Sequence, residues 1–328
     1  MKKSILFVCF MSFMVTIMGA ANQKAALPDD STYAVVNISV CNIRETGDFT
    51  SGMTTQALLG MPVRVLKYNG WAQIKTPDEY TGWVHRMAIQ TMTRGNFEKW
   101  NGADKIVVTS AYGFTYEKAD HHSQVVSDVV AGNRLKWIGN HGNYYYVSYP
   151  DGRKAYIANS IAMPEKVWRS HLKYDANSIV RTARSLVGIP YLWAGISTKG
   201  MDCSGFVRTV LFEHDIIIPR DAWQQALVGK KININPDFKN LLPGDLIFFG
   251  KKATEDKKEH VSHVAIYIGN ERFIHSLGYV HISSFNPKDK AYDKYNLNRL
   301  LFAVRFLPYI NKEKGLNTTN RNPYYLVK

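Results

Sequence analysis

A cysteine at the expected start of a helix is the residue best placed for nucleophilic chemistry. In the run Met201-Asp202-Cys203-Ser204-Gly205-Phe206, Asp202 suits the N-cap position, so Cys203 falls in the first helical turn. The unpaired backbone N–H groups and the helix dipole at that position favour a thiolate, which is the nucleophilic form of cysteine. Taken alone, the pattern also fits a small buried cysteine at a helix start.

Two histidines make the catalytic interpretation more specific. His263 opens an expected strand, His275 closes the next one, and a turn at 269–272 joins the two strands into a hairpin. One imidazole can take the thiol proton and return it to a leaving amine, while the other fixes the tautomer of the first. Strand histidines are often core or edge residues, but this pair downstream of Cys203 predicts acyl transfer by a cysteine–histidine pair.

An α+β domain over about 170–310 is expected to position these side chains. Apolar residues at helical spacing predict helices at 175–187, 203–214 and 223–227. Apolar runs then predict strands at 246–250, 263–269, 272–276 and 300–306. Helices followed by a run of antiparallel strands indicate the α+β class. The tail after Pro308 is polar, and we expect it to be peripheral.

Short strands with glycine turns fill the chain before this domain. Over 31–95 the residues alternate between apolar and polar, and Asn69-Gly70 is a strong hairpin signal. The pattern recurs more faintly over 103–163, with a turn at Asp151-Gly152. We therefore expect two small all-β barrels related as a degenerate tandem repeat.

The N-terminus, 1–21, has the pattern of a secretory signal peptide. Lys2 and Lys3 precede a short apolar run, and small residues at 19–21 predict cleavage near Ala21. The run is short for a membrane span, so we expect no stable membrane insertion after cleavage; an uncleaved anchor is the alternative. The expected location is the periplasm or the extracellular space.

The composition excludes several other classes of protein. The 328 residues are 45% hydrophobic and 21% charged, which argues against a disordered chain, a collagen-like repeat and a polytopic membrane protein. The formal net charge is +14, but the basic residues are scattered and no nucleic-acid motif accompanies them. We expect an anionic envelope polymer rather than nucleic acid as the partner, with a role in solubility alone as the alternative.

Two cysteines, Cys41 and Cys203, lie outside the signal segment. An exported protein can pair two such thiols, but a disulfide would silence the nucleophile. We therefore expect no disulfide, with Cys41 buried in the first barrel.

Five motifs, in order, resemble the NlpC family of papain-like cell-wall cysteine peptidases. They are Pro190-Tyr191-Leu192-Trp193-Ala194-Gly195, Asp202-Cys203-Ser204-Gly205-Phe206-Val207, Leu242-Pro243-Gly244-Asp245-Leu246, His263-Val264-Ala265-Ile266-Tyr267-Ile268-Gly269 and Phe273-Ile274-His275. The first barrel resembles bacterial SH3-like domains through Asn42-Ile43-Arg44, Asn69-Gly70-Trp71 and Tyr80-Thr81-Gly82-Trp83-Val84. The second barrel shares only the general pattern of strands and turns. With this domain order, the chain resembles the γ-D-glutamyl-L-diamino acid endopeptidases of the family, which cut muropeptides between D-glutamate and the diamino acid.

The resemblance implies a role for each matching residue. Cys203 is implied as the nucleophile, His263 as the general base, His275 as its orienting partner and Tyr191 as an aid to the oxyanion. The implied substrate contacts are Asp202, which would hold the free amine of L-alanine, together with Ser204, Trp193, Arg220, Asp221 and Tyr80. Arg220 would pair with Asp221 or face a substrate carboxylate. Ala194 and Ala222 depart from the family pattern, which has glycine and serine there.

No metal or cofactor is expected. His260 and His263 have HxxH spacing and His121 and His122 are adjacent, but no further ligand motif accompanies either pair. We expect a monomer. Two other functions fit less well: a wall-binding protein with an inactive papain-like domain, and a related acyl transferase or amidase.

Overall fold

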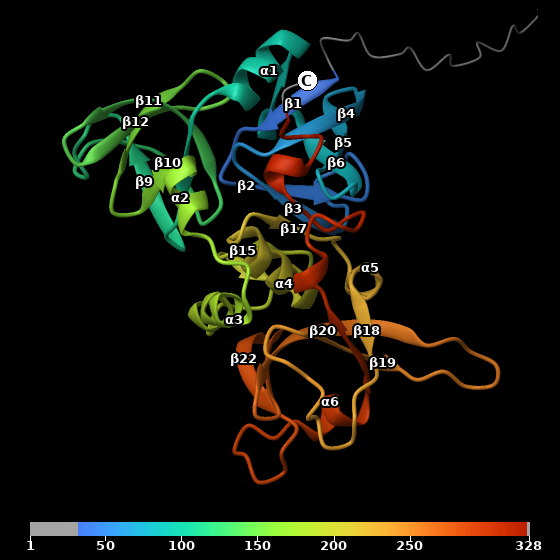
Figure 1. Ribbon diagram of the computed structural model, residues 1–328. Coiled ribbons are helices and arrows are strands. Elements are labelled where there is room, and N and C mark those ends of the chain that lie inside the picture. Colours follow the sequence, from blue (N-terminus) through green and yellow to red (C-terminus); the bar gives the residue numbers. More distant parts are fainter. Residues whose placement is uncertain (1–31, 327–328) are drawn as a thin grey trace, which may run out of the picture.

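The computed structural model describes residues 32–326 as two small barrels followed by an α+β region (Figure 1). The expected fold class, a papain-like α+β domain after two all-β barrels, is confirmed. The predicted signal segment, 1–21, lies outside the described residues. Within 32–326, no helix is long and apolar enough to cross a membrane.

The first barrel is a seven-stranded sheet with the strand order β3-β2-β6-β5-β4-β1-β7. Its elements are β1 (Tyr33–Val36), β2 (Val40–Arg44), β3 (Met53–Leu58), β4 (Pro62–Tyr68), β5 (Trp71–Lys75), β6 (Thr81–His85), the 3-10 helix η2 (Arg86–Ala88) and β7 (Ile89–Met92). The predicted Asn69-Gly70 turn joins β4 to β5, and Gly70 has φ 83, which glycine adopts without steric cost. Cys41 lies in the buried core of this barrel, as expected.

The second barrel repeats this topology strand for strand, in the order β10-β9-β13-β12-β11-β8-β14. Its strands are β8 (Lys105–Val108), β9 (Tyr112–Tyr116), β10 (Val125–Val130), β11 (Arg134–His141), β12 (Tyr144–Ser148), β13 (Lys154–Ala158) and β14 (Ala162–Pro164). A helix that the sequence pattern did not predict, α1 (Arg94–Gly102), links the barrels. The Thr93 hydroxyl caps it, and it buries Phe97 and Trp100 against Val35.

The helices of the α+β region follow the second barrel. They are α2 (Glu165–His171), α3 (Ala176–Ser185), α4 (Cys203–Phe212) and α5 (Ala222–Gln225). The side chains of Asp175 and Asp202 accept hydrogen bonds from the backbone N–H groups of Ser178 and Gly205, so each caps its helix. The apolar α4 is almost wholly buried and packs on the sheet, which fixes the position of its first residue, Cys203.

The sheet of this region is six-stranded, in the order β18-β23-β19-β20-β21-β22. Its strands, all paired antiparallel, are β18 (Lys230–Ile232), β19 (Leu246–Lys251), β20 (His260–Gly269), β21 (Arg272–Leu277), β22 (Tyr279–Ser284) and β23 (Leu300–Arg305). The apolar runs in the sequence did not predict β18 and β22. The remaining elements are α6 (Lys294–Asn298), η3 (Leu307–Tyr309), η4 (Thr319–Arg321) and the short pairs β15 (Ile196–Ser197) with β16 (Gly200–Met201) and β17 (Ile216–Ile217) with β24 (Asn317–Thr318).

The expectation that the tail after Pro308 is peripheral is wrong. Leu316, Thr319 and Asn322 are buried, and the Asn322 side-chain amide donates to the carbonyl of Pro77 in the first barrel. The polar composition of the tail reflects these hydrogen bonds, because buried amide and hydroxyl groups need partners.

Candidate active site

A cleft of about 520 Å³ lies between the first barrel and the α+β region. It is lined by nine of the ten residues singled out from the sequence: Tyr80, Tyr191, Trp193, Asp202, Cys203, Ser204, Arg220, Asp221 and His263. The tenth, His275, is fully buried and hydrogen-bonds to His263. Residues that are up to 195 positions apart in the sequence, from Tyr80 to His275, therefore meet at one place.

Cys203 begins α4 as the cap pattern predicted, but burial opposes the thiolate that the helix start favours. Burial raises the pKa of the Cys203 thiol to about 11, and the charge of Asp202 adds to this effect. Hydrogen bonds from the backbone N–H groups of Val264 and Ser204 lower the pKa by less. The contact with Val264 places the sulfur beside the strand that carries His263. Cys41 and Cys203 are both free, as expected.

His263 and His275 meet on adjacent strands, β20 and β21, of the predicted hairpin. Nε2 of His263 lies 2.8 Å from Nδ1 of His275, and the two rings are edge to face. Burial lowers the pKa of His263 to about 3 and that of His275 to about 2. Both imidazoles are therefore neutral near pH 7, which leaves His263 able to accept a proton.

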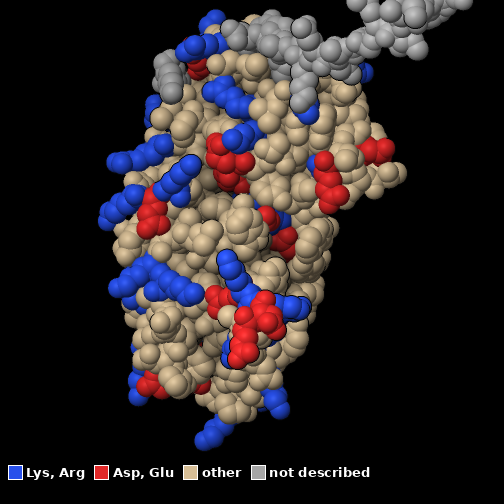
Figure 2. All heavy atoms as spheres, turned by 90° about the vertical axis from the view of Figure 1, so that its right-hand side faces the viewer, with Lys and Arg blue, Asp and Glu red and all other residues tan. Residues whose placement is uncertain are grey.

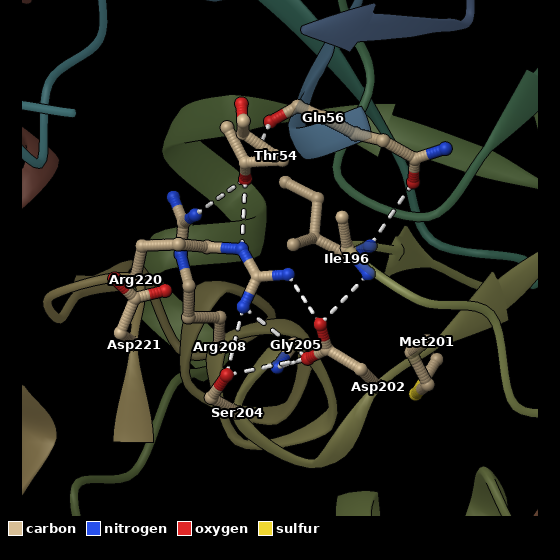
Figure 3. A network of polar contacts seen from close by, with 12 residues as sticks. Thr54, Gln56, Ile196, Met201, Asp202, Ser204, Gly205, Arg208, Arg220 and Asp221 are labelled. Carbon is tan, nitrogen blue, oxygen red and sulfur yellow. Dashed lines mark hydrogen bonds and ion pairs between the residues drawn. The ribbon is translucent and has the colours of Figure 1, made fainter. Parts of the chain in front are cut away.

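Asp202 is already neutralised by a buried arginine (Figure 3). Arg220 donates from Nη2 to Oδ2 of Asp202 at 2.5 Å and from Nη1 to Oδ1 at 3.2 Å. The same carboxylate accepts hydrogen bonds from the backbone N–H groups of Gly205 and Ala194. The N-cap interpretation of Asp202 is confirmed. Arg220 pairs with Asp202 rather than with Asp221, and its expected contact with a substrate carboxylate stays a prediction.

Arg220 also ties the site to the first barrel. Its Nη1 donates to the Ser204 hydroxyl at 2.7 Å and its Nε to the Thr55 hydroxyl of β3 at 2.9 Å. A second buried arginine, Arg208 of α4, pairs with Asp78 of the first barrel. Ser204 is thus part of a buried network that holds the barrel against the start of α4 (Figure 3).

The other predicted residues form the walls of the cleft. Burial is the main cause that raises the pKa of Tyr191 to about 12, and the charge of Asp202 adds to it, so its hydroxyl keeps its proton as a donor. Trp193 is 70% exposed at the rim. Burial raises the pKa values of Tyr80 and Asp221, and the charge of Asp221 further raises that of Tyr80. Ala194 has φ 62, a conformation that explains the glycine usual in the resembling family.

Sequence reasoning missed Glu45, which follows β2 in the first barrel and lines the same cleft. A lone acidic residue in a loop carries no local signal, because its contact with the site depends on how the two regions pack. Arg299 and His260 of the α+β region also line the cleft, and the sequence reasoning did not single them out as substrate contacts.

Comparisons with known proteins agree with this geometry. Residues 188–300 match the NlpC/P60 family, and residues 43–89 match the bacterial dipeptidyl-peptidase SH3 domain. The chain is 31% identical over 234 residues to a γ-D-glutamyl-L-lysine dipeptidyl-peptidase of Bacillus cereus, over 68% of this chain and 67% of that protein. The chain belongs to the NlpC/P60 family. It is therefore a cysteine peptidase with an N-terminal SH3-like region.

Two further NlpC/P60 relatives support this conclusion. A γ-D-glutamyl-L-lysine dipeptidyl-peptidase of Bacillus subtilis is 29% identical over 231 residues, 68% of this chain and 71% of that one. The crystal structure of an NlpC/P60 family protein from Bacillus cereus superposes with a TM-score of 0.70 at 25% identity, covering 84% of this chain and all of that chain. The structural similarity thus extends over most of the chain, beyond the segment 188–300 that matches the NlpC/P60 family.

Proposed function

We propose that this peptidase hydrolyses the γ-D-glutamyl–diamino acid bond of peptidoglycan peptides that carry a free N-terminal L-alanine. The observation that carries the proposal is the cleft itself, which joins a cysteine and a neutral histidine to acidic residues of the first barrel and α5. The names of the two Bacillus dipeptidyl-peptidases point to the same bond.

The chemistry starts from a neutral pair. The Cys203 sulfur attacks the γ-carbonyl carbon of D-glutamate while its proton passes to His263, so that thiolate character develops with the attack rather than before it. Backbone N–H groups at the start of α4 and the Tyr191 hydroxyl stabilise the oxyanion. His263 then protonates the departing amine, and water hydrolyses the thioester to free Cys203.

The free amine of L-alanine is held by Glu45, Asp221 and the Tyr80 hydroxyl. Asp202, the residue first expected to do this, already shares its charge with Arg220. The positive charge of a bound ammonium would stabilise the Asp221 carboxylate and so offset the effect of burial, which raises the pKa of Asp221. Because the first barrel forms this wall, a peptide extended at its N-terminus would meet the barrel, and the enzyme acts on released fragments.

The direct experiment incubates the protein with L-Ala-γ-D-Glu-diaminopimelate and identifies the products by mass. We expect the dipeptide L-Ala-D-Glu and free diaminopimelate, and no products with Cys203→Ala. Binding without hydrolysis by the unaltered protein would favour an inactive wall-binding protein. A product joined to an added amine would favour an acyl transferase, and release of free L-alanine would favour hydrolysis of a different amide bond.

Export to the cell envelope is part of the proposal. It rests on the pattern of residues 1–21. Basic and acidic side chains are interspersed over the face in Figure 2, which is unlike the continuous basic tract of a nucleic-acid-binding surface. The mass of the protein recovered from the expressing cells tests it: loss of about the first 21 residues is expected, and an intact N-terminus would contradict it.

A further inference from the structure

A third histidine continues the hydrogen-bonded chain that starts at His263. His281 lies on β22 directly opposite His275 in the register of β21 and β22. Nε2 of His275 is 3.1 Å from Nε2 of His281 and 3.0 Å from the Ser283 hydroxyl. His275 is fully buried, so these neighbours, rather than solvent, set the position of its proton.

The far end of the chain is a group that can only accept. Nδ1 of His281 lies 2.8 Å from the backbone carbonyl oxygen of Tyr279. A carbonyl has no proton to give, so Nδ1 of His281 must carry the hydrogen. In a neutral imidazole the other nitrogen is then an acceptor, which makes Nε2 of His281 an acceptor for His275.

The tautomer of His281 determines which nitrogen carries the hydrogen in His275 and then in His263. His275 donates from Nε2, so its Nδ1 has a lone pair and accepts from Nε2–H of His263 across 2.8 Å. His263 therefore keeps an unprotonated Nδ1. The Ser283 hydroxyl can donate or accept, so it supports His275 in either tautomer and does not select one.

We propose that His281, anchored on the Tyr279 carbonyl, is a positioning residue that selects the tautomers of His275 and His263 and so leaves Nδ1 of His263 free to take the proton of Cys203. The inference rests on the proposed function for the role of Cys203 and His263, but the tautomers themselves do not depend on the substrate. A chain of three histidines here does the orienting work that a carboxylate does in a serine protease triad.

The tautomers can be read directly by nitrogen NMR of the full-length protein labelled with ¹⁵N-histidine. In the unaltered protein we expect His263 and His275 to carry hydrogen on Nε2 and His281 on Nδ1. A hydrogen on Nδ1 of His275 would overturn the proposal without any variant being made.

Variants test the consequence for reactivity. His281→Leu removes the acceptor for Nε2–H of His275 and should lower kcat about tenfold with KM unchanged. Adding Ser283→Ala to this variant should lower kcat further. Ser283→Ala alone should have little effect on kcat. His281→Gln offers an amide oxygen to Nε2–H of His275 and should restore most of the rate. An equal loss in His281→Gln and His281→Leu, or no loss in the double variant, would refute the proposal.

Alkylation of Cys203 by iodoacetamide separates this inference from the proposed substrate. The rate at Cys203, followed by peptide mass, should fall in His281→Leu in parallel with kcat, because it depends on the same base. If the unaltered protein fails to cleave the tripeptide but its Cys203 alkylation still depends on His281, the substrate is wrong and the positioning role stands. If alkylation is unaffected, the positioning role is wrong.

Discussion

The two barrels share a topology, yet only the first contributes to the catalytic cleft. Their strand orders are identical when each strand is shifted by seven, and equivalent turns close with the same hydrogen bonds, Thr76 N–H to the Tyr80 carbonyl and Tyr149 N–H to the Arg153 carbonyl. An acidic residue also occupies the equivalent position in both barrels. The backbone N–H of Glu45 donates to the carbonyl of Gly52, and the backbone N–H of Glu117 donates to the carbonyl of Gln124 after the equivalent strand.

The difference between the barrels lies in what each one faces. Glu45 and Tyr80 line the cleft beside Cys203, whereas Glu117 is exposed at the surface of the second barrel. The shared fold alone therefore does not give the two barrels the same function. The first barrel contributes to the cleft because it packs against α4. The second barrel instead joins the α+β region through Arg134, which pairs with Glu165 and Asp215.

The largest expected effect comes from the buried arginines that hold each barrel. Arg220→Met leaves the Asp202 charge buried and unpaired, which should cost about 3–5 kcal/mol of unfolding free energy and also impair catalysis. Arg134→Met should cost a similar amount but leave kcat/KM of the folded protein unchanged. Urea denaturation and kinetics check both; equal kinetic damage from the two variants would contradict the distinction between the barrels.

The two cysteines give the next largest contrast. Because burial raises the pKa of Cys203 to about 11, its alkylation rate in a His263→Ala variant, which lacks the base, should rise about 100-fold from about pH 7 to about pH 9, following the thiolate fraction. Cys41, whose pKa is raised to about 12 by burial in the first barrel, should stay unreactive until the protein unfolds. A Cys203 rate that is already constant at about pH 7 would instead indicate a preformed thiolate.

The equivalent glutamates provide a matched pair of variants. Glu45→Gln should lower kcat/KM for the free-amine tripeptide about 10- to 100-fold, the usual size of a hydrogen bond to a charged group. Glu117→Gln should leave kcat/KM unchanged. If both variants behave alike, the first barrel takes no part in recognising the amine.

Tyr80→Phe should have the smallest effect. Removing its hydroxyl loses one neutral donor or acceptor, so KM should rise about 2- to 10-fold with kcat nearly unchanged. Steady-state kinetics on the same tripeptide measure this, and a kcat loss larger than the KM change would place Tyr80 in the chemical step.

Local patterns predicted the elements that carry the candidate site well. The Asp202 cap, the helix after Cys203 and the histidine-bearing hairpin each depend on a few neighbouring residues, and each is present in the structure. The contacts between distant segments could not be predicted in this way. Pairing of Arg220 with Asp202, the position of Glu45 and the burial of the tail at Asn322 all depend on domain packing.

The expectation of a thiolate at Cys203 took account of only one of two opposing effects. The helix start does lower its pKa through backbone N–H groups, but the apolar packing that fixes α4 also buries the sulfur, and burial dominates. The sequence pattern shows the N-cap of α4, but the burial of the Cys203 sulfur depends on how the folded chain packs.

The most direct test of the account compares L-Ala-γ-D-Glu-diaminopimelate with its N-acetylated form. With the amine bound by Glu45, Asp221 and Tyr80, the free peptide should be cleaved with a kcat/KM at least about 100-fold higher, because acetylation removes the charge and adds bulk against the barrel. Equal kcat/KM values for the two peptides would contradict the central role of the first barrel in selecting the substrate.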